Sequence, residues 1–405
     1  MEPFSPKGWS AADVADPYPV YRRYREADPV HQAEPSTWYV FGYDHVARTL
    51  SGRHFGRNMP AHIPGRNDAL RRSVENWLVF LDPPRHTRLR RWLAGEFSPN
   101  VVADLRPQIA AIAENLVRPL TVRPRLDLVA EFAAPLPVLV ICALLGVPGS
   151  QHGWFRERAM WLQEASSSRA ARGADAFSQA ETAARALTEY FTEEVRRRRG
   201  GGAAGADLVS LLAKAEGLTI DEITATCIHL LTAGHETTTN LLGKSVLAMT
   251  ARPEFADRLR AHPELVPLAV EELIRFDPPV QMVTRWATTA QWLGDREIAN
   301  GDKVVLVLGS ANRDPRRFPE PDELRLDRGS ARQVGFGLGI HYCLGAQLAR
   351  AEAEIALPLL LDLLSGHTVG EVRYGDDMVF HGPVRLELAT VSGVAGVDVA
   401  GQFDA

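Results

Sequence analysis

Residues 333–350 read QVGFGLGIHYCLGAQLAR, a glycine-rich loop that runs into the start of an apolar helix. The cysteine of this loop, Cys343, stands where free backbone N–H groups at a helix N-terminus stabilise negative charge. We therefore expect the pKa of its thiol to be lowered. One alternative is a buried structural cysteine in a glycine turn. A second is a dinucleotide-binding loop, but a GxGxxG count from Gly335 or from Gly337 does not end on glycine.

The composition of the loop favours haem over both alternatives. Gly337, Gly339 and Gly345 carry no side chains, so a flat macrocycle could lie against the backbone. Phe336 could pack on the proximal side of the sulfur. A cysteine thiolate is one of the few protein ligands for haem iron, so we expect Cys343 to be that ligand.

The run FGLGIHYCLG, residues 336–345, resembles the haem-binding signature of cytochromes P450. Most members that lack a membrane anchor carry His where this chain has Leu338, and often Pro where it has Gln347. Neither departure touches the ligand. The resemblance implies a mainly α-helical P450 fold with a small β-rich region near the N-terminus. It also implies haem b with Cys343 as the axial iron ligand, and O2 as co-substrate.

Two more segments resemble the family in the expected order. ELIR at residues 272–275 is similar to the ExxR element, whose acid and arginine lie one helical turn apart and can pair. In the family, this pair locks the core that seats the cysteine loop. Residues 311–319, from ANRDP to Phe-Pro, resemble the meander. Glu323 stands where many relatives have arginine, so we expect Arg325 or Arg328 to be the third partner of the pair.

The segment AGHETT, residues 233–238, lies inside a long apolar helical pattern from 221 to 251. A mid-helix glycine costs about 1 kcal/mol relative to alanine, and threonine hydroxyls can bond back to carbonyls. The segment is therefore either a weak point in a core helix or a groove for O2. The resemblance implies a groove, with Ala233 beside the haem and Glu236 and Thr237 as the acid and alcohol that deliver protons. His235 is a candidate proton relay.

Haem propionates need cationic or hydrogen-bonding partners. The resemblance implies that these are His86 and Arg90 in PPRHTRLR, Arg285 in VTRW, and His341. Because these segments converge on one cofactor, we expect residues 1–405 to form a single P450 domain. The GGGAAG run at 200–205 would be a loop within it, and 391–405 a frayed tail.

Bulk properties exclude several classes of protein. A net charge of −5 and a pI near 6.2 argue against nucleic-acid binding. Three scattered cysteines do not make a disulfide framework. The longest apolar stretch, 133–147, contains two prolines and is too short to cross a bilayer. We expect a cytoplasmic protein without a membrane segment.

No flavin or nicotinamide fingerprint is found in the chain, so electrons must come from another protein. The resemblance implies a ferredoxin with its ferredoxin reductase. We expect the ferredoxin to dock on a basic face near Arg88, Arg91 and Arg350, which would attract an acidic partner.

The family's substrate-recognition regions fall on 53–77, 161–168, the helix face around 231–235, 279–283 and 377–382. Their polar side chains suit an anionic, aromatic ligand. The candidate substrate-binding residues are Arg57, His62, Arg66, Gln163, Gln281 and His381.

Several longer segments resemble the bacterial enzymes that close the indolocarbazole ring, among them ENWLVFLDPP, LLTAGHETTTN and DDMVFHGP. Those enzymes act on chromopyrrolic acid, a bis-indole pyrrole dicarboxylate. The resemblance thus implies intramolecular aryl–aryl coupling. The alternatives are a regioselective hydroxylase of another natural-product intermediate, a peroxide-using haem-thiolate enzyme, and a non-catalytic partner protein. The intact Glu236–Thr237 pair argues against the second of these, and the presence of Cys343 against the third.

Overall fold

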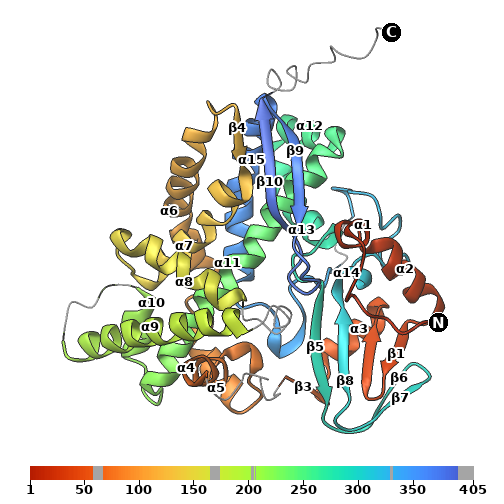
Figure 1. The fold of residues 1–405 in the computed structure, drawn as a ribbon, viewed down its shortest axis with the longest axis horizontal. Helices are drawn as coiled ribbons and strands as arrows, with labels where there is room; N and C mark the ends of the chain where they lie inside the picture. Colours follow the sequence, from red (N-terminus) through yellow and green to blue (C-terminus); the bar gives the residue numbers. More distant parts are fainter. Residues whose placement is uncertain (58–66, 165–173, 202–204, 206, 329–331, 391–405) are drawn as a thin grey trace, which may run out of the picture.

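The fold is shown by a computed structural model, which describes residues 1–57, 67–164, 174–201, 205, 207–328 and 332–390 (Figure 1). It is mainly helical, as expected. The helices are α1 (Ala11–Ala15), α2 (Tyr18–Ala27), α3 (Tyr43–Ser51), α4 (Asp68–Val74), α5 (Arg85–Ala94), α6 (Pro99–Val117), α7 (Pro135–Leu145), α8 (His152–Glu164), α9 (Ala174–Arg199), α10 (Leu208–Ala213), α11 (Ile220–Thr250), α12 (Pro253–Ala261), α13 (Val266–Phe276), α14 (Leu308–Ala311) and α15 (Ala346–Gly366).

Short helical turns and strands complete the fold. Turns of 3-10 helix cover Leu78–Phe80, Arg118–Leu120, Gly149–Gln151, Pro263–Leu265 and Gly339–His341, and a π-helical turn covers Val129–Ala133. The strands are β1 (Val30–Glu34), β2 (Thr37–Val40), β3 (Phe55–Gly56), β4 (Arg125–Asp127), β5 (Met282–Ala287), β6 (Gln291–Leu293), β7 (Arg296–Ile298), β8 (Lys303–Val307), β9 (His367–Tyr374) and β10 (Pro383–Thr390).

The main sheet joins the N-terminal strands to strands from the second half of the chain. Its order is β1-β2-β8-β5-β3, with β2 and β8 parallel and the other neighbours antiparallel. It lies at the lower right of Figure 1, apart from the helices around α11. The expected β-rich region near the N-terminus is therefore present, but β5 and β8 complete it. Two smaller sheets have the orders β4-β10-β9 and β6-β7.

Helix α11 runs through the centre of the helical part, as the apolar pattern from 221 to 251 predicts. It begins with a capping box, in which the Thr219 hydroxyl accepts from the N–H of Glu222 and the Glu222 carboxylate accepts from the N–H of Thr219. Most of its side chains are buried. Helices α7, α9 and α15 pack against it.

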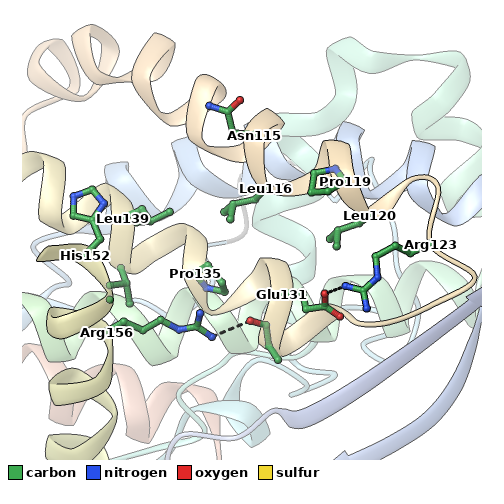
Figure 2. Close-up of a pocket in the computed structure, with 13 residues that line it drawn as sticks. Asn115, Leu116, Pro119, Leu120, Arg123, Glu131, Pro135, Leu139, His152 and Arg156 are labelled. Carbon is green, nitrogen blue, oxygen red and sulfur yellow. Dashed lines mark hydrogen bonds and ion pairs between the residues drawn. The ribbon is translucent and has the colours of Figure 1, made fainter. Parts of the chain in front are cut away.

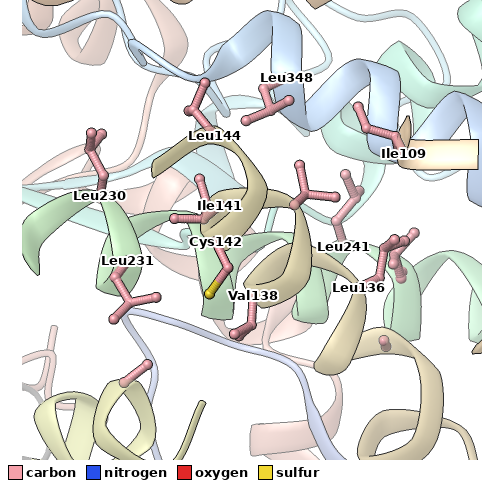
Figure 3. Close-up of a cluster of buried hydrophobic side chains, with 14 of the residues drawn as sticks. Ile109, Leu136, Val138, Ile141, Cys142, Leu144, Leu230, Leu231, Leu241 and Leu348 are labelled. Carbon is pink, nitrogen blue, oxygen red and sulfur yellow. The ribbon is translucent and has the colours of Figure 1, made fainter. Parts of the chain in front are cut away.

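Figure 3 shows α7 and α11 in contact, with Ile141 and Cys142 of α7 close to Leu231 of α11. Burial raises the pKa of Cys142 to about 12, and burial does the same for Cys227 in α11. Both thiols are fully buried in the core. Among the residues that the structure describes, no helix is both long and apolar enough to span a membrane.

The weak hydrophobic periodicity of residues 53–76 predicts mostly loop, but the structure forms β3 and α4 there. Ala69, Leu70 and Val74 of α4 are buried against the core. The first N–H groups of the helix have no partner on α4 itself. Instead, the Glu181 carboxylate of α9 accepts from the N–H groups of Ala69 and Leu70, at 3.2 and 2.9 Å. A cap that comes from a residue so far along the chain leaves no local sequence signal.

Candidate functional site

The cysteine loop packs its backbone against the end of α3. Gly337 and Gly339 adopt positive φ angles of +70° and +69°, which favour glycine. A Cβ on Gly339 would lie 2.7 Å from the carbonyl oxygen of Leu50. This glycine therefore permits contact with α3, whereas around Gly345 no atom would meet an added Cβ within 4 Å. Among Gly337, Gly339 and Gly345, only Gly345 has no atom within 4 Å of an added Cβ, so it best fits the predicted contact with a macrocycle.

Cys343 is held by the same loop. Its N–H donates to the carbonyl of Phe336 at 2.9 Å, and the Phe336 ring lies beneath the guanidinium of Arg350, 4.5 Å from ring centroid to guanidinium carbon. Burial raises the pKa of the Cys343 thiol, although the N–H of Gly345 and the charges of Arg90 and Arg350 oppose this. The expected lowering of this pKa is therefore wrong, because burial outweighs the stabilising groups. A coordinating cation would deprotonate such a thiol.

The predicted acid–arginine pair is formed and buried. The Nε and Nη2 atoms of Arg275 donate to the two carboxylate oxygens of Glu272 at 2.7 and 2.9 Å. The Nε of Arg328 donates to the same carboxylate at 2.7 Å, whereas Arg325 contributes only its backbone N–H, at 2.8 Å. Of the two candidates for the third side chain, Arg328 is the one that the structure selects.

This pair is connected directly to the cysteine loop. The Nη1 of Arg275 donates to the carbonyl of Asn312 at 3.0 Å. The side-chain oxygen of Asn312 accepts from the N–H of Val334 at 2.8 Å, at the beginning of the loop. The Glu272–Arg275 pair thus fixes where the loop starts.

The four residues expected at the propionates come together from three parts of the chain. His86 and Arg90 lie on α5, Arg285 on β5 and His341 on the turn before Cys343. The rings of His86 and His341 have centroids 4.4 Å apart. Burial and the charges of Arg285, His86, Arg57 and Arg90 lower the pKa of His341, so its imidazole is neutral. We call these four residues together with Arg57 the cation cluster.

Arg57 was expected to contact substrate, but its guanidinium is anchored within the protein. It donates to the carbonyls of Val79 at 2.8 Å and Thr284 at 2.6 Å. Burial lowers the pKa of Arg57 to about 10 and that of Arg285 to about 9, and the charge of Arg57 contributes to the second shift. The charge of Asp82 opposes both shifts. Sequence reasoning missed the place of Arg57 in this cluster.

The cation cluster fits an anionic group with several acceptor oxygens. The guanidinium groups of Arg57, Arg90 and Arg285 donate to neutral backbone carbonyls, and the carboxylate of Asp82 offsets the charges of Arg57 and Arg285 only in part. Both ring nitrogens of His86 and the Nε2 of His341 are buried without a hydrogen-bond partner among the described residues. Buried unpaired donors and charges are costly. Haem propionates would satisfy both needs, so these residues fit the predicted cofactor.

Helix α11 is continuous through 233–238, so the AGHETT segment does not interrupt it. A Cβ on Gly234 would lie 3.0 Å from the Ile141 side chain, so this glycine allows α7 to pack closely on α11. Ala233 is exposed, and Glu236 and Thr237 are partly exposed, on a helix that is otherwise mostly buried. The Thr237 hydroxyl donates to the carbonyl of Ala233 at 3.1 Å.

The residues expected at the substrate are not gathered in one place. His62 and Arg66 lie outside the described residues, and so does the side chain of Gln163, whose backbone belongs to α8. His235 is buried.

Gln281 and His381 are corrections, because both side chains lie in the core and each uses a nitrogen there, although Gln281 Oε1 and His381 Nδ1 have no hydrogen-bond partner among the described residues. The Gln281 amide donates to the carboxylate of Asp277 at 3.1 Å and to the carbonyl of Pro278 at 2.9 Å. The Nε2 of His381 bonds to the carbonyl of Val14 at 2.6 Å. Both side chains are buried and do not face a ligand.

Two aromatic residues near α11 were also missed. His229 precedes Ala233 by one turn, and its ring stacks on Trp77 with centroids 5.2 Å apart. The spacing of four and seven residues from His229 to Ala233 and Glu236 could have placed it on their face of the helix.

On the face expected to bind a ferredoxin, two of the three arginines already form ion pairs within the protein. Arg88 pairs with Glu222, and Arg350 pairs with Glu271. Arg91 is exposed. The charge available there for an acidic partner is therefore smaller than the sequence suggests.

A surface pocket of about 490 Å³ lies between α6, α7 and α8 (Figure 2). Leu116, Pro135, Leu139 and His152 line it, and the Arg123–Glu131 pair lies at its edge. None of the predicted site residues lines it.

Comparisons with known proteins agree with the geometry. The cytochrome P450 family model matches residues 171–373. The cytochrome P450 monooxygenase PikC of Streptomyces venezuelae is 37% identical over 367 residues, covering 86% of this chain and 84% of that protein. Mycinamicin IV hydroxylase/epoxidase of Micromonospora griseorubida is 35% identical over 385 residues, covering 90% of this chain and 94% of that protein.

Solved structures give the same result. The crystal structure of CalO2 has a TM-score of 0.87 and 31% identity, and the match covers 97% of this chain and 100% of CalO2. Members of the matching family are haem-thiolate monooxygenases that hold haem b through an axial cysteine and use O2. Since the family model spans half of the sequence and the relatives span most of it, the chain belongs to the cytochrome P450 family.

Proposed function

We propose that this P450 catalyses intramolecular indole–indole coupling of chromopyrrolic acid in indolocarbazole biosynthesis. The observation that supports the haem site is the cation cluster beside Cys343, whose buried donors and charges need an anionic partner. The substrate assignment rests on the sequence segments that resemble the ring-closing enzymes. The similarity to mycinamicin IV hydroxylase/epoxidase supports a place in bacterial secondary metabolism.

In this proposal Cys343 is the axial ligand of the haem iron. His86, Arg90, Arg285 and His341 hold the propionates, because they supply buried donors and positive charge. Phe336 and Gly337 shape the loop that carries the sulfur. Gly345 leaves the open space into which the macrocycle fits. The single-domain organisation of residues 1–405 stays a prediction.

The exposed face of α11 would contribute the proton-handling groups. When bound, haem b activates O2 to oxidise the substrate. Ala233 has no bulky side chain, so its exposed position leaves room above the helix. The Glu236 carboxylate would take protons from solvent, and the Thr237 hydroxyl would hold a proton donor on the same face. His235 stays a candidate relay.

Electrons would be supplied by a ferredoxin and its reductase. Arg91 is the exposed member of the expected docking face. For the substrate, an anionic bis-indole would be attracted by the positive charges of Arg57 and Arg285, which Asp82 offsets only in part.

The mass of the product tests this proposal. The purified protein, supplied with ferredoxin, ferredoxin reductase, NADPH and O2, should convert chromopyrrolic acid to a product that has lost two hydrogen atoms. Joining two indole carbons removes one hydrogen from each ring, whereas hydroxylation adds one oxygen atom. A monohydroxylated product would favour the hydroxylase alternative, and failure of the acid to bind would rule out this substrate.

A further inference from the structure

His229 lies on the exposed face of the central helix. With 3.6 residues per turn, positions 229, 233, 236 and 237 fall on one side of α11. Ala233 is exposed, and the other three are partly exposed, although their neighbours 230–232 and 238–246 are buried. His229 is therefore beside the residues that form the open face of this helix.

The plane of the His229 ring is fixed by stacking. Its imidazole lies parallel to the indole of Trp77, with a centroid separation of 5.2 Å and an interplanar angle of 14°. The indole N–H of Trp77 donates to the hydroxyl of Ser73 at 3.1 Å, which holds the indole in place. Trp77 in turn stacks on Phe80 at 6.2 Å and 12°.

This stack connects α11 to the cation cluster. The guanidinium of Arg57 lies over Phe80, 5.4 Å from the ring centroid. The ladder His229–Trp77–Phe80–Arg57 therefore joins the exposed face of α11 to the buried charges around His341. Because His229 stacks on an indole that Phe80 and Ser73 hold in place, its ring has little freedom to reorient.

The ring nitrogens of His229 are available to a ligand. Among the described residues, neither nitrogen forms a hydrogen bond, and the side chain is only partly buried. Burial and the charge of Arg57 lower the pKa of His229 to about 4. The imidazole is thus neutral near pH 7 and carries one acceptor nitrogen.

We propose that His229, oriented by Trp77, is a specificity-determining hydrogen-bond acceptor for the ring N–H of an indole-type substrate. This inference rests on the proposed function for the substrate class, but it concerns a residue to which the resemblance gives no role. A flat stacked ring that presents an acceptor at its edge matches an aromatic N–H donor. It does not match an aliphatic chain, which has no donor to offer.

Binding to the haem-loaded protein tests the proposal, with indole and 1-methylindole as probes. The two differ in the N–H that His229 would accept. Calorimetric titration of the wild type should show about tenfold tighter binding of indole. His229→Phe keeps a ring that can stack on Trp77 but has no nitrogen, so it should bind both probes equally weakly.

His229→Gln restores an acceptor and should recover part of the preference for indole. Trp77→Phe retains an aromatic ring but removes the indole that is anchored to Ser73, so its preference should fall between those of the wild type and His229→Phe. The CO-complex spectrum and the unfolding temperature should be unchanged in His229→Phe, which separates loss of the acceptor from loss of folding. An equal preference for indole in wild type and His229→Phe would overturn the proposal, and so would failure of the wild type to prefer indole.

Binding of a bis-indole dicarboxylate to the wild type and to His229→Phe distinguishes the proposed substrate from the proposed acceptor role of His229. If the dicarboxylate fails to bind while the indole preference depends on His229, the proposed substrate is wrong and the acceptor role stands. If the dicarboxylate binds equally well to wild type and His229→Phe, the acceptor role is wrong and the proposed substrate stands.

Discussion

Cys343 and Cys142 are both thiols whose pKa is raised by burial, yet their surroundings differ. Arg90 and Arg350 lie close enough to Cys343 to oppose the shift, whereas burial acts alone on Cys142. A thiol with cations beside it can become a metal-bound thiolate at lower cost. This difference in charge, rather than in burial, favours Cys343 over Cys142 as the proposed ligand.

We therefore expect Cys343→Ser to abolish the red-shifted Soret band that a thiolate-bound haem gives when reduced protein binds CO. Cys142→Ser is the matched control, because it changes another buried thiol that lies in the contact between α7 and α11. The control should keep the band. A normal band in Cys343→Ser would show that another residue holds the iron.

The fraction of electrons from NADPH that ends up in product should depend on the side-chain hydroxyl of Thr237. Thr237→Ala should keep haem and substrate binding, because the hydroxyl donates only to the backbone carbonyl of Ala233 among the described residues. More of the electrons from NADPH should then appear as hydrogen peroxide, since the proton donor is lost. Thr237→Ser retains the hydroxyl and should stay coupled. Measuring NADPH consumed per product formed decides this, and unchanged coupling in the alanine variant would exclude the role.

Glu352 of α15 should make stability depend on pH. Burial raises its pKa to about 8, and among the described residues its Oε2 has no hydrogen-bond partner. The unfolded chain loses this proton near the ordinary value of 4.5, whereas the folded protein keeps it until about 8. Raising the pH through that window therefore favours unfolding, by up to about 1.4 kcal/mol per pH unit.

Glu352→Gln should remove this dependence, because the amide does not titrate. The free energy of unfolding of the wild type, measured with urea from pH 5 to pH 8, should fall relative to that of the variant. Glu354→Gln on the same helix alters a carboxylate that pairs with Arg106 and should keep the wild-type slope. Parallel curves for wild type and Glu352→Gln would contradict the prediction.

The residues that the sequence placed correctly are those in motifs with fixed spacing. The pair at 272–275 is an example, because one helical turn brings both side chains together whatever surrounds them. The sequence could not show that Gln281 and His381 face the core, because a polar side chain reveals its hydrogen-bonding capacity but not its direction. Only the fold brings Asp277 and Val14 to them.

At the scale of elements, α11 and α4 show what local pattern can predict. Helix α11 carries its own capping box and a long apolar pattern, so its existence and bounds could be predicted. Helix α4 is short, and its N-terminus is capped by Glu181 of α9. Its stability depends on a contact that forms only in the folded chain, so no local sequence pattern indicated it.

Glu181→Gln should therefore weaken α4 selectively. A neutral amide oxygen is a poorer acceptor for the N–H groups of Ala69 and Leu70, so we expect α4 to lose about 1 kcal/mol of local stability. Hydrogen exchange at residues 68–74 should become faster, while exchange in α11 should not change. Glu189→Gln alters an exposed carboxylate on the same helix and serves as control. Equal exchange in both variants would show that the cap contributes nothing.

At the scale of the whole molecule, the cation cluster joins parts of the chain that lie far apart in the sequence. It takes residues from the end of β3, from α5, from β5 and from the turn before Cys343. The family resemblance predicted four of its members. The fifth, Arg57, could not be predicted, because its place depends on the carbonyls of Val79 and Thr284, which approach each other only in the folded protein.

Arg285 should consequently have opposite effects on the protein with and without its cofactor. Its guanidinium is buried, that burial lowers its pKa to about 9, and it donates to the neutral backbone carbonyl of Thr284. In the apoprotein this charge is a cost, so Arg285→Met should raise the free energy of unfolding by about 1 to 3 kcal/mol. With haem bound, the same substitution removes a partner of the propionate.

The haem-loaded variant should therefore lose its cofactor faster than the wild type and gain less stability from it. Urea unfolding of both forms, together with transfer of haem to an excess of apomyoglobin, measures the two effects. Arg91→Met, at an exposed arginine of α5, should change neither. If Arg285→Met also destabilised the apoprotein, Arg285 would be a residue that stabilises the fold. The cation cluster would then not be a binding site for an anionic group.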